Sequence, residues 1–212
     1  MAKLYLVRHG ETDYNKTFRF QGQTDIPLNE TGLDQARQVG EHFRDIPLAA
    51  VYSSSLKRAF STAEAIAEPK GLTPVACDEF MELNFGKWEG MHSQVIAEEY
   101  AEDWEAYFRH PGSYQIPGGE SMRQVQERSY ARLKEILAAH PEGDVAVVAH
   151  GGIIRVLVCT LLGMDLDRVW NIHVANSSTT CFYYWGESYT LEYANMNYYL
   201  KQPGMEVNFK AR

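Results

Sequence analysis

The sequence has few cysteines, no excess of positive charge and no uninterrupted apolar run of membrane-spanning length. Its 212 residues include 20 Lys and Arg against 28 Asp and Glu, which gives a formal net charge of −8. Binding to nucleic acid or to an anionic membrane requires a basic surface, so we expect neither as a partner. Gly and Pro, at 16 and 8 residues, are too few for collagen-like or low-complexity chains. These absences favour a globular protein with a small-molecule partner.

The three cysteines are Cys77, Cys159 and Cys181, which are too few and too widely spaced for a disulfide framework or a zinc motif. Buried thiols in a reducing cytoplasm explain them, so we expect a cytoplasmic protein. No two histidines have the spacing of a zinc-binding helix, and we expect no metal and no other cofactor. The longest apolar stretch, residues 145–163, contains Arg155. An Arg near the centre of a membrane span costs about 2.5–3.5 kcal/mol, so a buried strand followed by a buried helix is the better interpretation.

Short apolar runs alternate with segments of helical periodicity. The runs 4–7, 49–52, 75–76 and 145–149 predict strands, and segments 179–185 and 189–193 around a turn predict a hairpin. Helical patterns cover 32–44, 56–66, 93–108, 122–137 and 153–162.

Local signals set some of the boundaries of these segments. Thr31 is the expected cap of the first long helix, which should bury Leu33, and Ser121 with Gln124 forms a capping box. Strands that alternate with helices predict an α/β fold, a three-layer sandwich. Its central sheet is mainly parallel, helices cover both faces, and the C-terminal hairpin is antiparallel. We expect one domain over residues 1–212, with a loose tail from about residue 202.

Basic side chains follow three of the predicted strands. Arg8 and His9 come after the first, Arg58 a few residues after the second, and His150 after the strand at 145–149. Ligands of such sheets bind beyond the carboxyl ends of the strands, so these four side chains should converge on one crevice. Charge-assisted hydrogen bonds contribute about 1.5–3 kcal/mol each, and a phosphate dianion is the natural occupant. The Gly151-Gly152 pair would let backbone N–H groups approach that anion.

The segment Leu6-Val7-Arg8-His9-Gly10-Glu11-Thr12 resembles the signature of the histidine phosphatase superfamily, also called the phosphoglycerate mutase-like family. A chance match to its Arg-His-Gly-Glu-Thr portion in a chain of this length has odds of about one in ten thousand. The resemblance extends from residue 3 to about residue 180. Further segments match in order: Asn15, Gln21-Gly22, residues 25–28, Gly32, residues 35–36, 52–59, 62–63, 82–90 and 150–152.

The resemblance implies a role for each residue of the crevice. His9 is the nucleophile that accepts the phosphoryl group, which agrees with the availability of neutral imidazole near pH 7. Arg8 and Arg58 hold the transferring oxygens, and His150 hydrogen-bonds them in the transition state. Glu82 is the general acid that protonates the leaving alcohol. Further residues that bind substrate are Asn15, Gln21, Gly22 and Gly151.

Other charged and aromatic residues receive structural interpretations. We expect Glu11 to support the site from behind and Arg155 to form a structural ion pair. His42, His110 and His140 fit solvated positions, as His92 and His173 do unless they reach the pocket rim. The aromatic residues near the C-terminus fit the sheet, and a homodimer surface is their alternative use.

Three functions remain open at this point. The first is a phosphomonoesterase that acts on a small phosphorylated metabolite, similar to α-ribazole-5′-phosphate phosphatases or to broad-specificity phosphatases. The second is a cofactor-dependent phosphoglycerate mutase; these enzymes usually carry a basic insertion between the acid segment and the second His motif. Here 67 residues separate Glu82 from His150 and contain no adjacent arginines, which favours the hydrolase. The third is a phosphate-binding regulatory protein without turnover.

Overall fold

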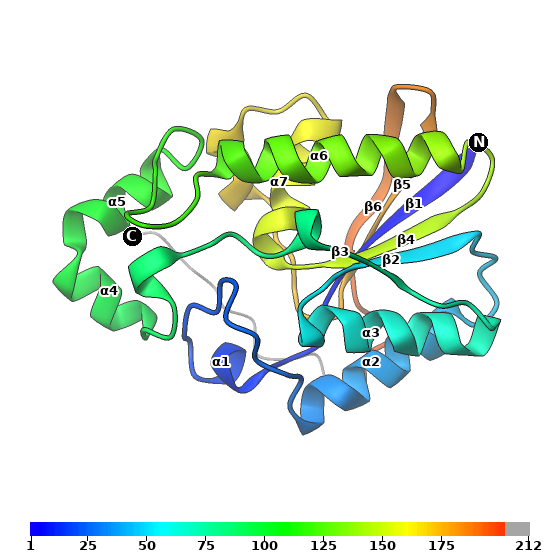
Figure 1. Cartoon of the computed structure of the whole chain (residues 1–212), viewed down its shortest axis with the longest axis horizontal. Helices are drawn as coiled ribbons and strands as arrows, with labels where there is room; N and C mark the ends of the chain where they lie inside the picture. The colour runs from blue at the N-terminus through cyan, green and yellow to red at the C-terminus, as the bar shows by residue number, and fades with distance from the viewer. Residues whose placement is uncertain (202–212) are drawn as a thin grey trace.

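The computed structural model describes residues 1–201, which fold around one six-stranded sheet in the order β3-β2-β4-β1-β5-β6 (Figure 1). The pairs β1·β4, β2·β4 and β2·β3 are parallel, and β5 pairs antiparallel with both β1 and β6. The predicted mainly parallel sheet with a C-terminal antiparallel hairpin is confirmed, whereas the tail expected from residue 202 lies outside the described residues. The strands are β1 (Ala2–Arg8), β2 (Ala50–Ser54), β3 (Val75–Cys77), β4 (Val145–Ala149), β5 (Thr179–Trp185) and β6 (Ser188–Met196).

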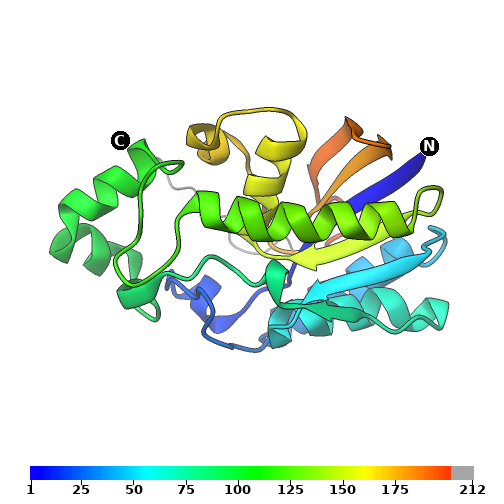
Figure 2. The same cartoon turned by 45° about the horizontal axis from the view of Figure 1, so that its top comes forward.

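Helices cover both faces of the sheet, as predicted (Figure 2). Helices α2 and α3 pack on one face, and α6 and α7 pack on the other. Helices α4 and α5 extend beyond one end of the sheet (Figure 1). The α-helices are α1 (Asp13–Lys16), α2 (Glu30–Phe43), α3 (Lys57–Ala67), α4 (Ser93–Glu99), α5 (Ala101–Arg109), α6 (Met122–Ala139) and α7 (Gly151–Leu161). Short 3-10 turns are η1 (Glu68–Lys70), η2 (Asp78–Phe80), η3 (Gly86–Trp88) and η4 (Leu166–Asn171).

Each central strand is apolar on both sides because each side faces a layer of helices. In β1, Leu4 and Leu6 join the core under α6 and α7, whereas Tyr5 and Val7 join the core under α2 and α3. All five residues of β4 are buried. The sheet is thus fixed from both sides, and this holds the carboxyl ends of β1 and β4 at a constant separation.

Helix ends follow local signals, with two corrections. The capping box of Ser121 and Gln124 is present at the start of α6, as predicted. The cap of α2 is Asn29 rather than the expected Thr31, because the Asn29 side chain accepts the Gly32 N–H at 2.8 Å. Leu33 is 51% exposed, so its expected burial was wrong: the buried stripe of α2 runs through Ala36, Val39 and Phe43 instead.

All three cysteines are buried, as the sequence predicted, and none of them forms a disulfide bond within residues 1–201. Among residues 1–201, no helix combines the length and the apolarity that crossing a bilayer requires.

The contact between α2 and α3 depends on Gly40. A Cβ at this position would lie 2.2 Å from the carbonyl oxygen of Ala65 on α3. We expect Gly40→Ala to lower the free energy of unfolding by about 1–3 kcal/mol, because the clash outweighs the gain in helix propensity. Urea denaturation measures the change, and Glu41→Ala on the exposed face of the same helix should alter it by less than about 0.5 kcal/mol. Equal stability of the two variants would contradict this packing.

Candidate active site

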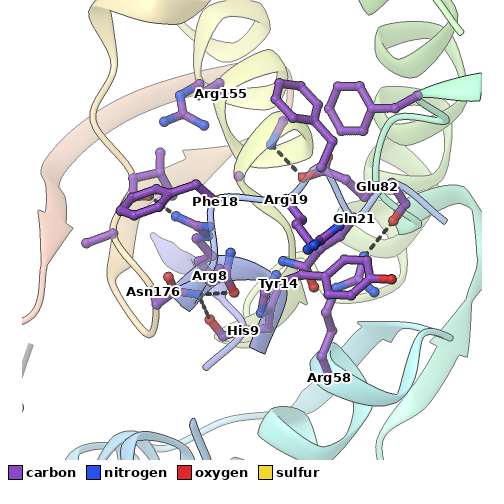
Figure 3. A pocket seen from close by; sticks show the side chains of 18 of the residues that line it. Arg8, His9, Tyr14, Phe18, Arg19, Gln21, Arg58, Glu82, Arg155 and Asn176 are labelled. Atoms are coloured by element: carbon purple, nitrogen blue, oxygen red, sulfur yellow. Dashed lines mark hydrogen bonds between the residues drawn. The ribbon is translucent and has the colours of Figure 1, made fainter. Parts of the chain in front are cut away.

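A pocket lies at the carboxyl end of β1, in front of the first turns of α3 and α7 (Figure 3). Eight of the nine predicted site residues line it, and His150 lies directly behind His9, with ring centroids 5.1 Å apart. The convergence predicted from the strand ends is confirmed for Arg8, His9 and Arg58. The predicted residues that line it are Arg8, His9, Asn15, Gln21, Gly22, Arg58, Glu82 and Gly151.

His9 is buried, and its tautomer is fixed by the backbone. Its Nδ1 lies 2.6 Å from the carbonyl oxygen of Gly10. A carbonyl oxygen can only accept, so Nδ1 carries the proton and the lone pair is on Nε2. The His9 N–H donates to the carbonyl oxygen of Ala149 on β4, and the His9 carbonyl oxygen accepts the Ser177 N–H. Both partners are far from His9 in the sequence. The ring is therefore oriented with one basic nitrogen available.

Arg58 and Arg8 are oriented by backbone carbonyl groups instead of by carboxylates. Arg58 on α3 donates to the oxygens of Gly22 at 2.6 Å and Thr24 at 2.9 Å. Arg8 donates from Nη1 to the oxygen of Val174 at 2.6 Å. The Nε atoms of both side chains are buried and have no hydrogen-bond partner among residues 1–201. No carboxylate of the described chain lies within 4.0 Å of either guanidinium group, so both charges lack an ion-pair partner.

His150 is buried between Ser54 and the pocket. Its Nε2 lies 2.8 Å from Ser54 Oγ, which also accepts the Leu56 N–H at 3.3 Å. Since the Ser54 hydroxyl proton has no other acceptor in the described chain, it is donated to Nε2, and the ring proton resides on Nδ1. That Nδ1 is buried and has no partner among residues 1–201. It is a donor on a ring that neighbours His9.

Glu82 lines the opposite wall and is held at both oxygens. Oε1 accepts the Leu83 N–H at 3.0 Å, and Oε2 accepts the Gly152 N–H at 3.1 Å, at the start of α7. Its backbone carbonyl accepts from Arg128, which is paired with Glu120 at 2.9 Å. The carboxyl group is therefore fixed in the pocket by elements on both sides of it.

Burial is the largest influence on the pKa values of the site, and it lowers the pKa of Arg8, Arg58, His9 and His150. Burial lowers the pKa of His9 and His150 well below 6.5, and the neighbouring Arg58 and Arg8 lower both further. Burial also lowers the pKa of Arg8 and Arg58 to about 10. Both arginines stay charged at neutral pH and both histidines stay neutral. The arrangement can bind a dianion next to a neutral nucleophile.

Comparisons with known proteins agree with this geometry. The sequence profile of the histidine phosphatase superfamily (branch 1) matches residues 4–197. Phosphoserine phosphatase 1 of Hydrogenobacter thermophilus is 37% identical over 178 residues, which cover 84% of each chain. The chain belongs to the histidine phosphatase superfamily. It is an enzyme of this superfamily, a phosphatase that acts on small phosphorylated substrates.

Solved structures of this superfamily share the fold. The mycobacterial glucosyl-3-phosphoglycerate phosphatase has a TM-score of 0.86 at 30% identity, with 92% of this chain and 99% of that chain covered. The alpha-ribazole phosphatase of Shigella flexneri has a TM-score of 0.83 at 26% identity, with 92% and 96% covered.

The remaining sequence-based assignments are mixed. Glu11 is buried, accepts a hydrogen bond from Asn29 and lies outside the pocket lining, as expected. His173 lines the pocket, whereas His92 caps α4 and does not reach the lining. The expectation that Arg155 forms an ion pair is wrong: it lines the pocket, and no carboxylate of residues 1–201 lies within 4.0 Å of it.

Sequence reasoning also missed the aromatic wall of the pocket. No local motif marks these side chains, because they come from four separate segments. Arg155 could have been found, since it lies one helical turn after Gly151 and so shares its face of α7. The missed lining residues are Tyr14, Phe18, Arg19, Phe20, Phe85, Tyr107, Phe108, Arg155, Trp170, Val174, Ala175 and Asn176.

The lowered pKa values of His9 and His150 predict an acid-labile fold. Below pH 6.5 these histidines take up protons in the unfolded chain but stay neutral in the folded chain. Proton uptake therefore stabilises the unfolded chain, and the free energy of unfolding falls as the pH falls. We expect the free energy of unfolding to drop between pH 7 and pH 5.5, by up to about 1.4 kcal/mol per pH unit for each histidine. Denaturation of the wild type and of His150→Asn across this range measures the effect. The variant should show a shallower slope, and parallel slopes would contradict the pKa assignment.

Proposed function

We propose that the chain hydrolyses a phosphate monoester of a small metabolite through a phosphohistidine intermediate on His9. The observation that carries this proposal is the free Nε2 of His9 in a pocket whose arginines have no carboxylate partner. A phosphate dianion supplies that missing charge and brings its phosphorus to the nucleophile.

In the first step, the lone pair on His9 Nε2 attacks phosphorus and the bond from phosphorus to the ester oxygen breaks. Arg8 and Arg58 hold the transferring oxygens and stabilise the charge that develops on them. Glu82 gives its proton to the departing oxygen, so the product leaves as an alcohol.

In the second step, water attacks the phosphohistidine. The Glu82 carboxylate takes a proton from the water, and the phosphorus–nitrogen bond breaks to return neutral His9. The His150 Nδ1–H donates to a phosphoryl oxygen in both steps. We propose that Asn15, Gln21, Gly22 and Gly151 border the same oxygens with neutral groups.

The segment between Glu82 and His150 supports a hydrolase over a phosphoglycerate mutase. This segment contains α4, α5, α6 and β4, and its contribution to the pocket is Phe85, Tyr107 and Phe108. No basic side chain of residues 83–149 is part of the lining. Release of an alcohol followed by attack of water needs no cation from this segment.

The names of the relatives indicate which substrates to test first. They comprise phosphoserine, glucosyl-3-phosphoglycerate and α-ribazole phosphate. A panel that contains these esters, both phosphoglycerates and p-nitrophenyl phosphate separates α-ribazole specificity from broad specificity. Interconversion of 2- and 3-phosphoglycerate faster than hydrolysis would favour the mutase.

Loss of the nucleophile tests the proposed route. We expect His9→Ala to abolish turnover of every ester in the panel and to remove the acid-labile phosphoryl label that the wild type acquires from labelled substrate. The wild type should be inhibited by vanadate and unaffected by EDTA. The control is His110→Ala, an exposed residue at the end of α5, which should retain wild-type turnover. Full turnover in His9→Ala would contradict the proposal.

The role of Ser54 can be tested separately. Removing its hydroxyl frees His150 Nε2 to take the proton, which leaves Nδ1 without the hydrogen that it donates. We expect Ser54→Ala to lower kcat by about 100-fold with little change in KM, as for the loss of one transition-state donor. Nitrogen-15 NMR of the ring reports the tautomer, Ser54→Thr should restore it, and Ser53→Ala is the matched control. An unchanged tautomer with wild-type kcat would contradict this role.

A further inference from the structure

Arg155 is a second cationic group in the pocket that the proposed phosphoryl chemistry does not use. It lies on α7, where its Nε donates to the carbonyl oxygen of Ile172 at 2.9 Å. Its guanidinium carbon lies 5.5 Å from the centre of the Trp170 ring, within the range of a cation–π contact. These contacts fix one edge and one face of the guanidinium group. Its terminal nitrogens make no hydrogen bond to any side chain or backbone group of residues 1–201.

Arg155 and Arg8 approach each other at Gly151. A Cβ at Gly151 would lie 2.9 Å from Arg155 Nη1 and 3.6 Å from Arg8 Cζ, so a glycine here leaves room for both groups. No carboxylate of the described chain lies within 4.0 Å of either. Two neighbouring guanidinium groups without a carboxylate in contact repel each other, and an anion bound from the pocket relieves that repulsion.

Arg155 lies away from the position expected for the transferring phosphoryl group. Figure 3 shows His9 and Arg58 at one end of the pocket and Arg155 at the other, with Arg8 between them. The wall beside Arg155 is aromatic and includes Tyr107, Phe108 and Trp170. An anion at Arg155 would therefore belong to the part of the substrate beyond the ester oxygen.

We propose that Arg155 binds a carboxylate on the leaving alcohol, so that the preferred substrates are small phosphomonoesters of hydroxy acids. Because Nε is bonded to Ile172, only the two terminal nitrogens remain, and two N–H donors match the two oxygens of a carboxylate. A phosphate dianion would leave one oxygen and one charge unmatched by this single group. The assignment rests on the proposed phosphohistidine route, since it names what that route acts on.

Two pairs of esters that differ in the carboxylate test this assignment in the wild type. O-phosphoserine is compared with O-phosphoethanolamine, and 3-phosphoglycerate with glycerol 3-phosphate. We expect kcat/KM to favour the carboxylate by about 10- to 100-fold in each pair, the range for hydrogen bonds to a charged group. In Arg155→Gln this preference should fall to less than about threefold, and Arg155→Lys should retain part of it. Arg168→Gln, an exposed residue of η4 outside the pocket lining, is the matched control and should keep the full preference.

The outcomes separate this inference from the proposed function. If the wild type forms no acid-labile phosphoryl intermediate on His9, the phosphohistidine route fails, whatever the preference. If the intermediate forms but the wild type shows no preference, or if Arg155→Gln lowers kcat/KM equally within each pair, the carboxylate assignment is overturned. Equal losses would show that Arg155 acts on the phosphoryl group or on the fold. A third pair, fructose 1,6-bisphosphate and fructose 6-phosphate, differs by a second phosphate. If the kcat/KM ratio within this pair exceeds the ratio within both carboxylate pairs, the carboxylate assignment is also overturned, and Arg155 binds a second phosphate instead.

Discussion

The site depends on positive charge that no carboxylate in contact neutralises. Arg8 and Arg58 are directed by carbonyl oxygens of Val174, Gly22 and Thr24, and no carboxylate of residues 1–201 pairs with them. A carbonyl dipole orients a guanidinium group without cancelling its charge, so the pocket keeps its attraction for an anion. Hydrogen bonds to these carbonyl groups offset part of the free-energy cost of burying the two cations. We expect a bound dianion to offset the rest. The rest of the fold supplies the rigidity that keeps the cations together in its absence.

The same charge explains the state of the two histidines. Burial and the neighbouring arginines lower the pKa of both rings, so both are neutral when substrate binds. Both rings carry the proton on Nδ1, but the protein binds the two rings at different nitrogens. His9 Nδ1–H donates a hydrogen bond to the carbonyl of Gly10, whereas His150 Nε2 accepts one from the hydroxyl of Ser54. One ring thus offers a lone pair and the other a donor.

Much of this arrangement could be predicted from the sequence, since the deciding signals are local. Apolar runs followed at once by Arg8-His9 and by His150 identify strand ends, and the ends of parallel strands meet. Positions that depend on distant contacts were harder to predict. Leu33 has helical spacing, but the face that α2 buries is set by its packing on α3. Arg155 was assigned an ion pair because a buried cation normally has one, and the sequence could not show that its neighbours would be a carbonyl and Trp170. The aromatic wall comes from separate segments, and no motif links them.

A crystal structure with vanadate tests the central claim most directly. The account predicts vanadium within bonding distance of His9 Nε2, with its oxygens on the guanidinium groups of Arg8 and Arg58 and on His150 Nδ1. One apical oxygen should point toward Glu82, where the leaving alcohol would depart. Vanadate bound elsewhere in the pocket, with Nε2 of His9 unbonded and Arg58 without contact to the anion, would contradict the account.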